Sequence, residues 1–243
     1  KHGEVVSVTT YRDRGFVPDA LVNYLALLGW SPGSDQEIMS REQLIAEFSL
    51  NAVNKSSAIF NFSEDDPRDW TDPKALWMNG EYLRAMPINE LVPLVREQLK
   101  RFNLWREEFD MSQRQWVAAT IDLLRARYRS AQDFATLGRP YFSDEFEYEP
   151  EAVKKNLKDE RLKALMPGLA DRLNSLEDFT HDSTESALRG YAEEQAVKAG
   201  LLINASRTAL TGQAVGPGMF DIMVTLGRQR TVERLRRVVA VLG

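Results

Sequence analysis

The best-defined hydrophobic pattern in the chain lies between Pro18 and Trp30. Apolar side chains recur there at helical spacing and build one face, made by Leu21, Tyr24, Leu25 and Leu28. Pro18 suits a first helical turn, where a missing N–H costs nothing, and Gly29 suits the left-handed position that ends a helix. The pattern predicts one buried helix over about residues 12–29, followed by Trp30 as a large apolar anchor.

Beyond Pro87 the apolar positions follow the helical period almost without interruption. Two faces are made by Leu91, Leu94, Val95, Leu99 and Phe102, and by Val117, Ile121, Leu124 and Tyr128. Further helices are predicted over about 151–164, 169–178, 182–200 and 201–211, and from Gly218 to the end with a stop at Gly227. Strand signals are sparse, so the sequence predicts a mainly α fold.

Breaker-rich stretches separate these helices. The segment Asn61–Pro73 is acidic and contains prolines, so it is predicted to be an exposed loop. Tyr82–Pro87 resembles the exit from a first domain, and Pro140–Pro150 is predicted to connect two domains. In the helix predicted over 182–200, Asp182 and Glu185 have the spacing of a helix-capping pair, and Gly200 is the expected stop.

Composition narrows the functional classes. The chain has 243 residues, 43% hydrophobic and 28% charged, which is typical of globular protein and enough for about two domains. It has no cysteine and only two histidines, so a thiolate nucleophile, a cysteine metal site and a histidine triad are excluded or very unfavourable. No phosphate-loop or dinucleotide fingerprint is present, and no apolar run or leader predicts a membrane or secreted protein.

The charge distribution is uneven. The net charge is −5, yet residues 142–194 carry 14 acidic and 7 basic side chains, whereas residues 195–243 carry 7 basic and 2 acidic ones. Such an asymmetry is compatible with a basic face on an acidic protein, which nucleic acid would favour. Helical surfaces also vary in sign without any functional reason, and charge alone favours that simpler interpretation.

Three arginines end one predicted helix, at positions 125, 127 and 129. Cations there are favoured by the helix dipole, which explains them without any ligand. Arg127 differs from its neighbours because it lies in one stripe with Trp116, Thr120 and Leu123, so it is predicted to be held by packing. A guanidinium positioned in that way can grip the edge of an unstacked base.

A second constellation joins Arg207 to the loop Gly216-Pro217-Gly218-Met219. Two glycines around a proline at a helix start expose backbone N–H groups and permit a close approach by a ligand. Arg207, one turn before Thr211, is predicted to point toward the same place. A tight turn between two helices explains the same glycines and remains the open alternative. Lys74 and Lys55 are weaker candidates for phosphate contacts.

Five segments of the chain carry a family resemblance. They are Tyr11–Gly15 with Pro18–Trp30, Lys55–Phe60, Leu76–Gly80 with Tyr82, Arg125–Arg127 with Phe134, and Ala209–Gly212 with Gly216–Phe220 and Leu226–Gly227. In this order, and over nearly the whole chain, they resemble bacterial glutamyl-tRNA synthetases, which are class I aminoacyl-tRNA synthetases. In that family an N-terminal domain activates glutamate with ATP and magnesium, and stem-contact and anticodon-binding domains follow it.

The resemblance implies an elongated array of three parts. Residues 1–86 would form a stem-contact domain, and residues 87–148 and 149–243 two helical anticodon-binding domains. The adenylate-binding signature has no counterpart here, and Lys1 corresponds to the end of the lysine-serine-lysine signature loop. The resemblance therefore implies no catalytic residue, no metal ligand and no cofactor in this chain, with ATP and magnesium acting in the full-length enzyme.

The resemblance also assigns roles to the candidate residues. Arg127 corresponds to the arginine that reads the third anticodon base, and Arg207 with Gly216–Met219 to positions around the other two. Lys74 corresponds to a stem contact, as Lys55 is expected to be. Because position 216 is glycine, only its backbone could make a contact there.

The predicted function is therefore recognition of glutamate tRNA by a monomeric, cytoplasmic, membrane-free protein that does not aminoacylate by itself. The rival from another class is a helical protein–protein interaction module. Its docking surface would be the C-terminal helix, which is rich in arginine, and its partner would be acidic.

Overall fold

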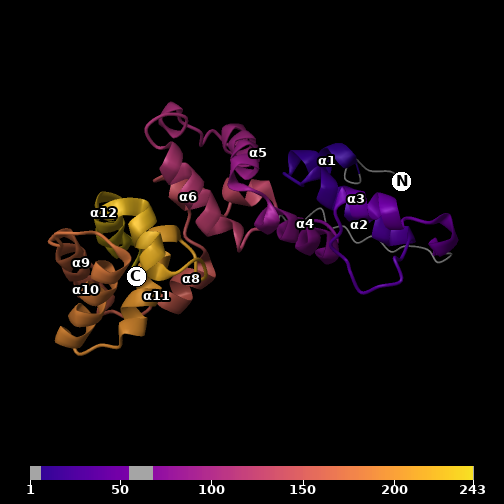
Figure 1. Cartoon of the computed structure of the whole chain (residues 1–243). Helices are drawn as coiled ribbons and strands as arrows, with labels where there is room; N and C mark the ends of the chain where they lie inside the picture. The colour runs from indigo at the N-terminus through magenta and orange to yellow at the C-terminus, as the bar shows by residue number, and fades with distance from the viewer. Residues whose placement is uncertain (1–6, 55–67, 243) are drawn as a thin grey trace. The chain divides into compact units, whose positions relative to one another are not determined.

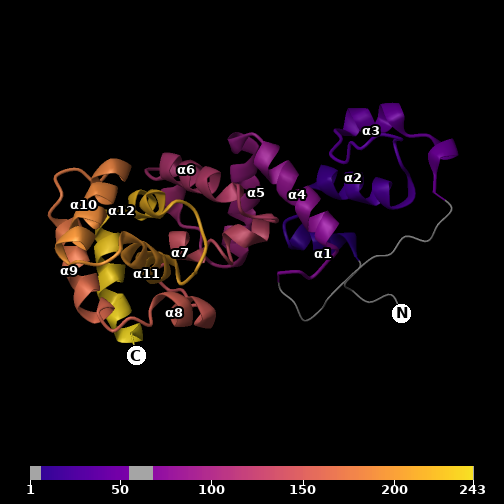
Figure 2. The same cartoon turned by 90° about the horizontal axis from the view of Figure 1, so that it is seen from below.

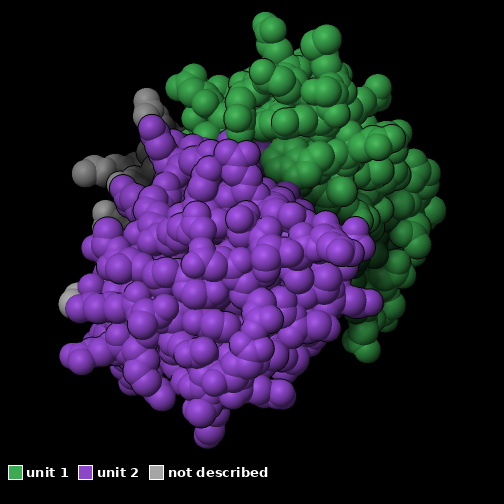
Figure 3. Space-filling model, turned by 90° about the vertical axis from the view of Figure 1, so that its left-hand side faces the viewer, with its two compact units in different colours: residues 1–137 green, residues 138–243 purple. Residues whose placement is uncertain are grey.

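The structure is a computed structural model that describes residues 7–54 and 68–242. Within these ranges it contains twelve α-helices and no β-sheet, and the only strand-like feature is one bridge between Trp30 and Val53. The arrangement of the helices along the chain is shown in Figures 1 and 2. The mainly helical class is thus confirmed. The chain forms two compact units, unit 1 over residues 1–137 and unit 2 over residues 138–243, coloured separately in Figure 3.

The described residues of unit 1 form six helices and three short 3-10 segments. The helices are α1 (Val8–Asp13), α2 (Pro18–Gly29), α3 (Arg41–Glu47), α4 (Pro73–Ala85), α5 (Ile88–Arg101) and α6 (Arg114–Arg125). The 3-10 segments are η2 (Leu50–Ala52), η3 (Glu107–Phe109) and η4 (Ala131–Phe134). The predicted boundary at 86/87 falls between α4 and α5, inside unit 1, and the three-part division stays a prediction.

The single helix predicted over residues 12–29 is wrong, because the chain turns at Gly15 and forms α1 and α2 separately. Gly15 has φ +78°, and its carbonyl accepts a hydrogen bond from the N–H of Ala131 at 2.9 Å. A Cβ at position 15 would lie 2.7 Å from the Cβ of Ala131, so only glycine fits this close approach. The apolar spacing predicted the buried positions Leu21 and Tyr24 of α2, but Leu25 of the predicted face is 46% exposed. The spacing also gave no sign of the contact that ends α1.

A buried asparagine holds the centre of unit 1. The side-chain oxygen of Asn79, on α4, accepts from the N–H of Val17 at 2.8 Å, at the start of α2. Its amide group donates to the carbonyl of Arg129 at 2.6 Å, just beyond α6. Asn79 is fully buried, so both partners are needed to offset the cost of desolvating the amide. Asn79 thus fixes the end of α6 relative to α2 and α4.

Unit 2 contains the remaining six helices. They are α7 (Arg139–Phe142), α8 (Pro150–Asn156), α9 (Leu162–Asn174), α10 (His181–Glu194), α11 (Ala199–Thr211) and α12 (Met219–Arg237), followed by the 3-10 segment η5 (Val238–Val241). Its core is largely aliphatic, with fully buried Leu169 on α9, Leu188 on α10, Leu210 on α11 and Ile222 on α12. This core positions the α11–α12 corner that carries Arg207.

Several helix boundaries predicted for unit 2 are wrong. Helix α10 begins after Thr180, whose hydroxyl accepts from the N–H of Ser183, so this pair and not Asp182 with Glu185 forms the cap. The helix ends at Glu194, and Gly200 lies inside α11. Likewise α9 begins at Leu162 and runs through Pro167 without a break. Capping residues abound in this sequence, and spacing alone does not say which pair is used.

Candidate nucleic-acid interface

The α11–α12 corner brings Arg207 and the glycine-rich loop together. Helix α11 ends at Gly212, which adopts the left-handed conformation with φ +73°, and α12 begins after Gly218. Between them the Nη1 of Arg207 donates a hydrogen bond to the carbonyl oxygen of Pro217 at 2.6 Å. The expectation that Arg207 and Gly216–Met219 share one place is thus confirmed. Their role as anticodon contacts stays a prediction.

Both glycines of this loop lie close to side chains of the corner. A Cβ at Gly216 would lie 3.2 Å from the Nη1 of Arg207, and a Cβ at Gly218 would overlap the carboxylate of Asp221. Pro217 and Met219 are buried, whereas Gly218 is exposed. The side chain of Met219 therefore packs into the core, and a ligand at this corner would meet the loop backbone and the half-buried guanidinium of Arg207.

The first turn of α12 adds polar groups to the corner. Gly218 supplies no side-chain cap, so the first N–H groups of the helix have no partner of that kind. The carboxylate of Asp221, in the same turn, lies 3.9 Å from the Nε2 of His181, and the His181 ring meets Phe220 edge-on at 5.6 Å. The corner thus combines a guanidinium, N–H donors that no N-cap side chain occupies, and one carboxylate, which together can recognise the mixed donors and acceptors of a base edge.

Arg127 lies in unit 1, beyond the end of α6. The helix ends at Arg125 with Ala126 as its C-cap, so Arg127 is exposed and is not held in the stripe of Trp116 as predicted. That prediction is wrong because the helical spacing stops before it reaches Arg127. In the described part of the chain its guanidinium has no hydrogen bond or ion pair.

The two neighbouring arginines are engaged within unit 1. Arg125 donates to the carbonyl of Met86 at 2.6 Å and pairs with Asp122 at 2.7 Å. Arg129 pairs with Asp69 at 2.8 Å and also donates to the backbone of residue 68. Of this triplet, Arg127 alone keeps its guanidinium free for an external ligand among the residues that the structure describes.

The lysine candidates divide between described and undescribed residues. Lys74 lies exposed in the first turn of α4, and its ammonium group pairs with the carboxylate of Glu37. A phosphate contact by Lys74 would have to compete with this exposed pair, which is worth about 0–1 kcal/mol. Lys55 and Lys1 lie outside the described residues.

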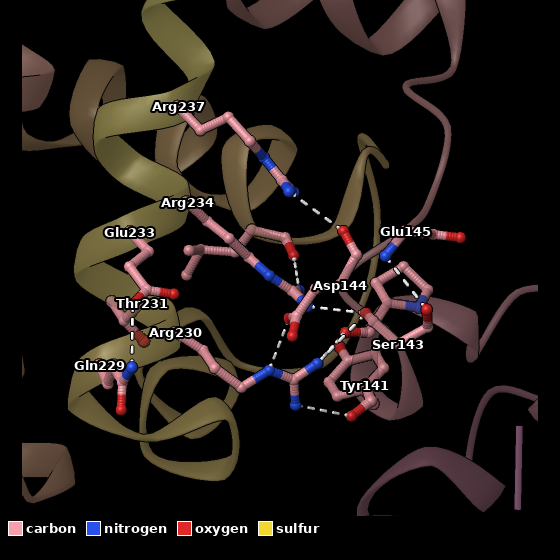
Figure 4. Close-up of polar contacts among 12 residues, drawn as sticks. Tyr141, Ser143, Asp144, Glu145, Gln229, Arg230, Thr231, Glu233, Arg234 and Arg237 are labelled. Atoms are coloured by element: carbon pink, nitrogen blue, oxygen red, sulfur yellow. Dashed lines mark hydrogen bonds and ion pairs between the residues drawn. The ribbon is translucent and has the colours of Figure 1, made fainter.

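Three arginines of the C-terminal helix, Arg230, Arg234 and Arg237, point toward the segment that follows α7 (Figure 4). Arg230 and Arg234 both bind the carboxylate of Asp144, at 2.8 and 2.7 Å, and Arg237 donates to its carbonyl. Arg234 is only 2% exposed, and its guanidinium carbon lies 4.6 Å from the centre of the Phe146 ring. Burial lowers the pKa of Arg234 to about 10, so the side chain remains protonated at neutral pH.

Two further arginines of this helix are also occupied. Arg236 pairs with Asp171 at 2.5 Å, and Arg228 donates to the carbonyls of Asn174 and Glu177. This internal use was not predicted from the sequence, in which the arginine-rich helix was a candidate docking surface. The available signal was the position of Arg234, which is one turn from both Thr231 and Val238 on the buried side.

Comparison with known proteins identifies the family. Residues 81–239 match the model of the anticodon binding domain, and residues 1–66 match that of the catalytic domain of class I tRNA synthetases for E and Q. The chain belongs to the anticodon-binding domain family. It represents the anticodon-binding region of glutamate-tRNA ligase, with a small piece of the catalytic domain at its N-terminus.

The relatives agree with this assignment. The chain is 50% identical to the glutamate–tRNA ligase of Desulfotalea psychrophila over 97% of its own length and 48% of that protein. It is 43% identical to glutamate–tRNA ligase 2 of Koribacter versatilis, over 98% of the chain and 47% of the relative. A solved glutamate tRNA ligase from Elizabethkingia meningosepticum superposes with a TM-score of 0.76 at 28% identity, over 96% of this chain and 43% of that one. The chain thus spans about half the length of these relatives.

Membrane-spanning helices and metal-binding clusters were sought among the described residues. None of the helices described is long and apolar enough to cross a membrane. Among residues 7–54 and 68–242, no three histidine, aspartate or glutamate side chains gather in a way that could hold a metal ion.

Proposed function

We propose that this chain is the tRNA-binding half of a glutamate-tRNA ligase, acting as a monomer in the cytoplasm on the tRNA for glutamate. The corner formed by Arg207 and Pro217 carries the proposal, because it joins a fixed guanidinium to an exposed backbone at a helix start. Arg207 and Gly216–Met219 would contact two anticodon bases. The free guanidinium of Arg127 would contact the third.

The same proposal gives the remaining residues supporting roles. Lys74 and Lys55 would hold the phosphate backbone of the tRNA stem, which fixes register and carries no sequence information. Residues 1–86 would form the stem-contact part, with residues 87–148 and 149–243 as the two anticodon-binding parts. Binding energy from these remote contacts would serve to place the acceptor end of the tRNA at the active site of the whole enzyme.

ATP and magnesium belong, in this proposal, to the whole enzyme. The donor groups of the described residues do not fit a metal ion, because no cluster of three suitable ligands exists among them. The proposed recognition uses neither cofactor. Lys1 would be a remnant of the end of the signature loop.

A binding titration on the 243-residue chain tests the proposal. Glutamate tRNA should bind with a steep salt dependence because counterions are released, and it should bind more tightly than a non-cognate tRNA. Arg207→Gln should weaken binding roughly fivefold or more, as expected for a lost base contact. The matched control is Arg236→Gln, which removes the same charge from an exposed arginine that pairs with Asp171. Equal affinity for all tRNAs, or equal losses in both variants, would refute the assignment.

A protein-docking role for the C-terminal helix finds no support in these contacts. The arginines that would meet an acidic partner already bind Asp144, Asp171 and backbone carbonyls inside unit 2. An acidic partner would have to displace those contacts first.

A further inference from the structure

Unit 1 contains a cavity whose lining includes none of the residues proposed to contact the anticodon. It has a volume of about 410 Å³ and lies between α5, the segment around η3, and α6. Its walls include Val92, Trp105, Phe109 and Val117, so most of the lining is apolar or aromatic. This volume falls in the range of sites that hold small ligands, roughly 300–1,000 Å³.

Polar groups converge on the same cavity. Arg96 lines it, with its guanidinium carbon 5.1 Å from the centre of the Trp105 ring and its Nη2 2.6 Å from Asp110. The Nε of Arg96 is buried without a hydrogen-bond partner in the described structure. Pro93 also lines the cavity and has no N–H, so the carbonyl of Asn89, one turn earlier on the same wall, lacks its helical donor.

The rim carries a cation that nothing in the described part of unit 1 neutralises. Arg114, at the start of α6, is exposed, lines the cavity, and makes no side-chain hydrogen bond or ion pair with the described residues. The carboxylate at the rim, that of Asp110, is already bound by Arg96 and by the indole N–H of Trp105 at 3.1 Å. The net character of the opening is therefore cationic, beside an aromatic wall.

We infer that this cavity takes up one unpaired nucleotide of the bound tRNA, with the base against Trp105 and a phosphate on Arg114. Aromatic rings with interleaved arginines are the combination that binds unstacked nucleotides, because the ring stacks on a base while the guanidinium holds the backbone. The carbonyl of Asn89, to which Pro93 cannot donate, would supply an acceptor for a base amino group. The inference rests on the proposed tRNA binding and adds a contact away from the α11–α12 corner.

Filling the cavity tests the inference directly. Ala118 is half-buried and lines the cavity, so Ala118→Phe places a ring in the space that the base would occupy. Its matched control is Ala119→Phe, one residue along α6, which is exposed and does not line the cavity. Affinity for glutamate tRNA should fall roughly five- to hundredfold in Ala118→Phe, the range for one lost stacking contact, and stay unchanged in Ala119→Phe.

The phosphate contact has its own readout. Arg114→Gln should lower the slope of log affinity against log salt by roughly 0.7–0.9, the value for one lost phosphate contact. Lys100→Gln removes the same charge from an exposed lysine on α5 outside the cavity and should leave the slope unchanged. If both variants change the slope equally, the charge acts from a distance and Arg114 holds no phosphate.

Ultraviolet crosslinking of the unaltered chain to glutamate tRNA tests the inference without relying on the stability of a variant. Crosslinked nucleotides should be found on the peptide that contains Trp105, and Ala118→Phe should remove them. If the wild-type chain binds tRNA, and crosslinks are found at the α11–α12 corner but none near Trp105, the inference fails while the proposed function stands. If the chain binds no tRNA, both fail. If a polyglutamate peptide displaces the Trp105 crosslink as well as RNA does, the cavity is a peptide site and the inference is wrong.

Discussion

Removing the carboxylate of Asp144 is the perturbation that unit 2 should feel most clearly. Asp144 accepts hydrogen bonds from Arg234 and Arg230 and so ties the segment after α7 to α12 (Figure 4). In Asp144→Ala both guanidinium groups lose their anionic partner, and the guanidinium of Arg234 remains buried. Arg234 keeps two neutral acceptors, the carbonyls of Leu210 and Ser143, at 2.6 and 2.8 Å.

The expected loss of stability follows from these contacts. A hydrogen bond to a charged group contributes about 1.5–3 kcal/mol, so two of them set an upper bound of about 3–6 kcal/mol. Asp144 is 62% exposed, and solvent screening lowers that bound. We therefore expect Asp144→Ala to destabilise unit 2 by about 2 kcal/mol. The control Asp171→Ala breaks the pair with Arg236, in which the side chains are 51% and 68% exposed, and should cost at most about 0.5 kcal/mol.

The distribution of tryptophan makes the measurement specific for one unit. All five tryptophans lie within residues 1–137, so their fluorescence reports on unit 1, whereas helical circular dichroism reports on both units. With a urea slope of about 2 kcal/mol per molar, Asp144→Ala should lower the midpoint of the unit 2 transition by about 1 M. The midpoint of the tryptophan fluorescence transition, which reports on unit 1, should stay unchanged and serves as the internal control. Equal midpoints for Asp144→Ala and Asp171→Ala would refute the argument that burial of Arg234 gives its pair more weight.

Three further substitutions have testable outcomes. Burial alone would raise the pKa of Asp144, but the hydrogen bonds from Arg234 and Arg230 outweigh burial and lower the pKa below its ordinary value of 3.8. Wild type should therefore be more stable than Asp144→Asn by the full difference at pH 7. Urea titrations well below pH 3.8 should show no difference, because Asp144 is then protonated. Gly212→Ala should destabilise unit 2 by about 2–4 kcal/mol in the same assay, because φ is +73° and the new Cβ would overlap the carbonyl of Glu147. Arg127→Gln should change stability by no more than about 0.5 kcal/mol yet reduce discrimination at the third anticodon base roughly fivefold or more, measured by binding tRNAs altered at that base.

Periodicity predicted the helices well, because each buries one apolar face. The predicted apolar face of α6 is fully or almost fully buried at Val117, Ile121 and Leu124. Helix ends were predicted less well, since several residues near each end can serve as a cap and tertiary contacts choose among them. Gly15 shows the same limit: its left-handed turn depends on a contact with Ala131, more than a hundred residues along the chain.

Contacts of the candidate site could be predicted from the sequence where the residues are close along the chain, and could not where they are far apart. Arg207 and Pro217 are ten residues apart on one helix–loop–helix corner, so their meeting follows from the turn between two helices. The partners of the C-terminal arginines lie far away in sequence, as with Arg234 and Asp144, which are ninety residues apart. No spacing rule links such residues, and only the folded core of unit 2 brings them together.

The same long-range pairing changes the meaning of the uneven charge. The acidic excess of residues 142–194 and the basic excess of residues 195–243 suggested a basic face that nucleic acid could use. In the folded unit, Asp144 and Asp171 from the acidic stretch bind Arg230, Arg234 and Arg236 of the basic stretch, so these three arginines are paired internally. Net charge by segment is therefore a poor guide to the RNA surface of this unit. In unit 1 a better guide is a guanidinium that the described residues leave without a carboxylate, as they do for Arg127 and Arg114. At these two positions the loss of a single charge should weaken tRNA binding without destabilising the fold.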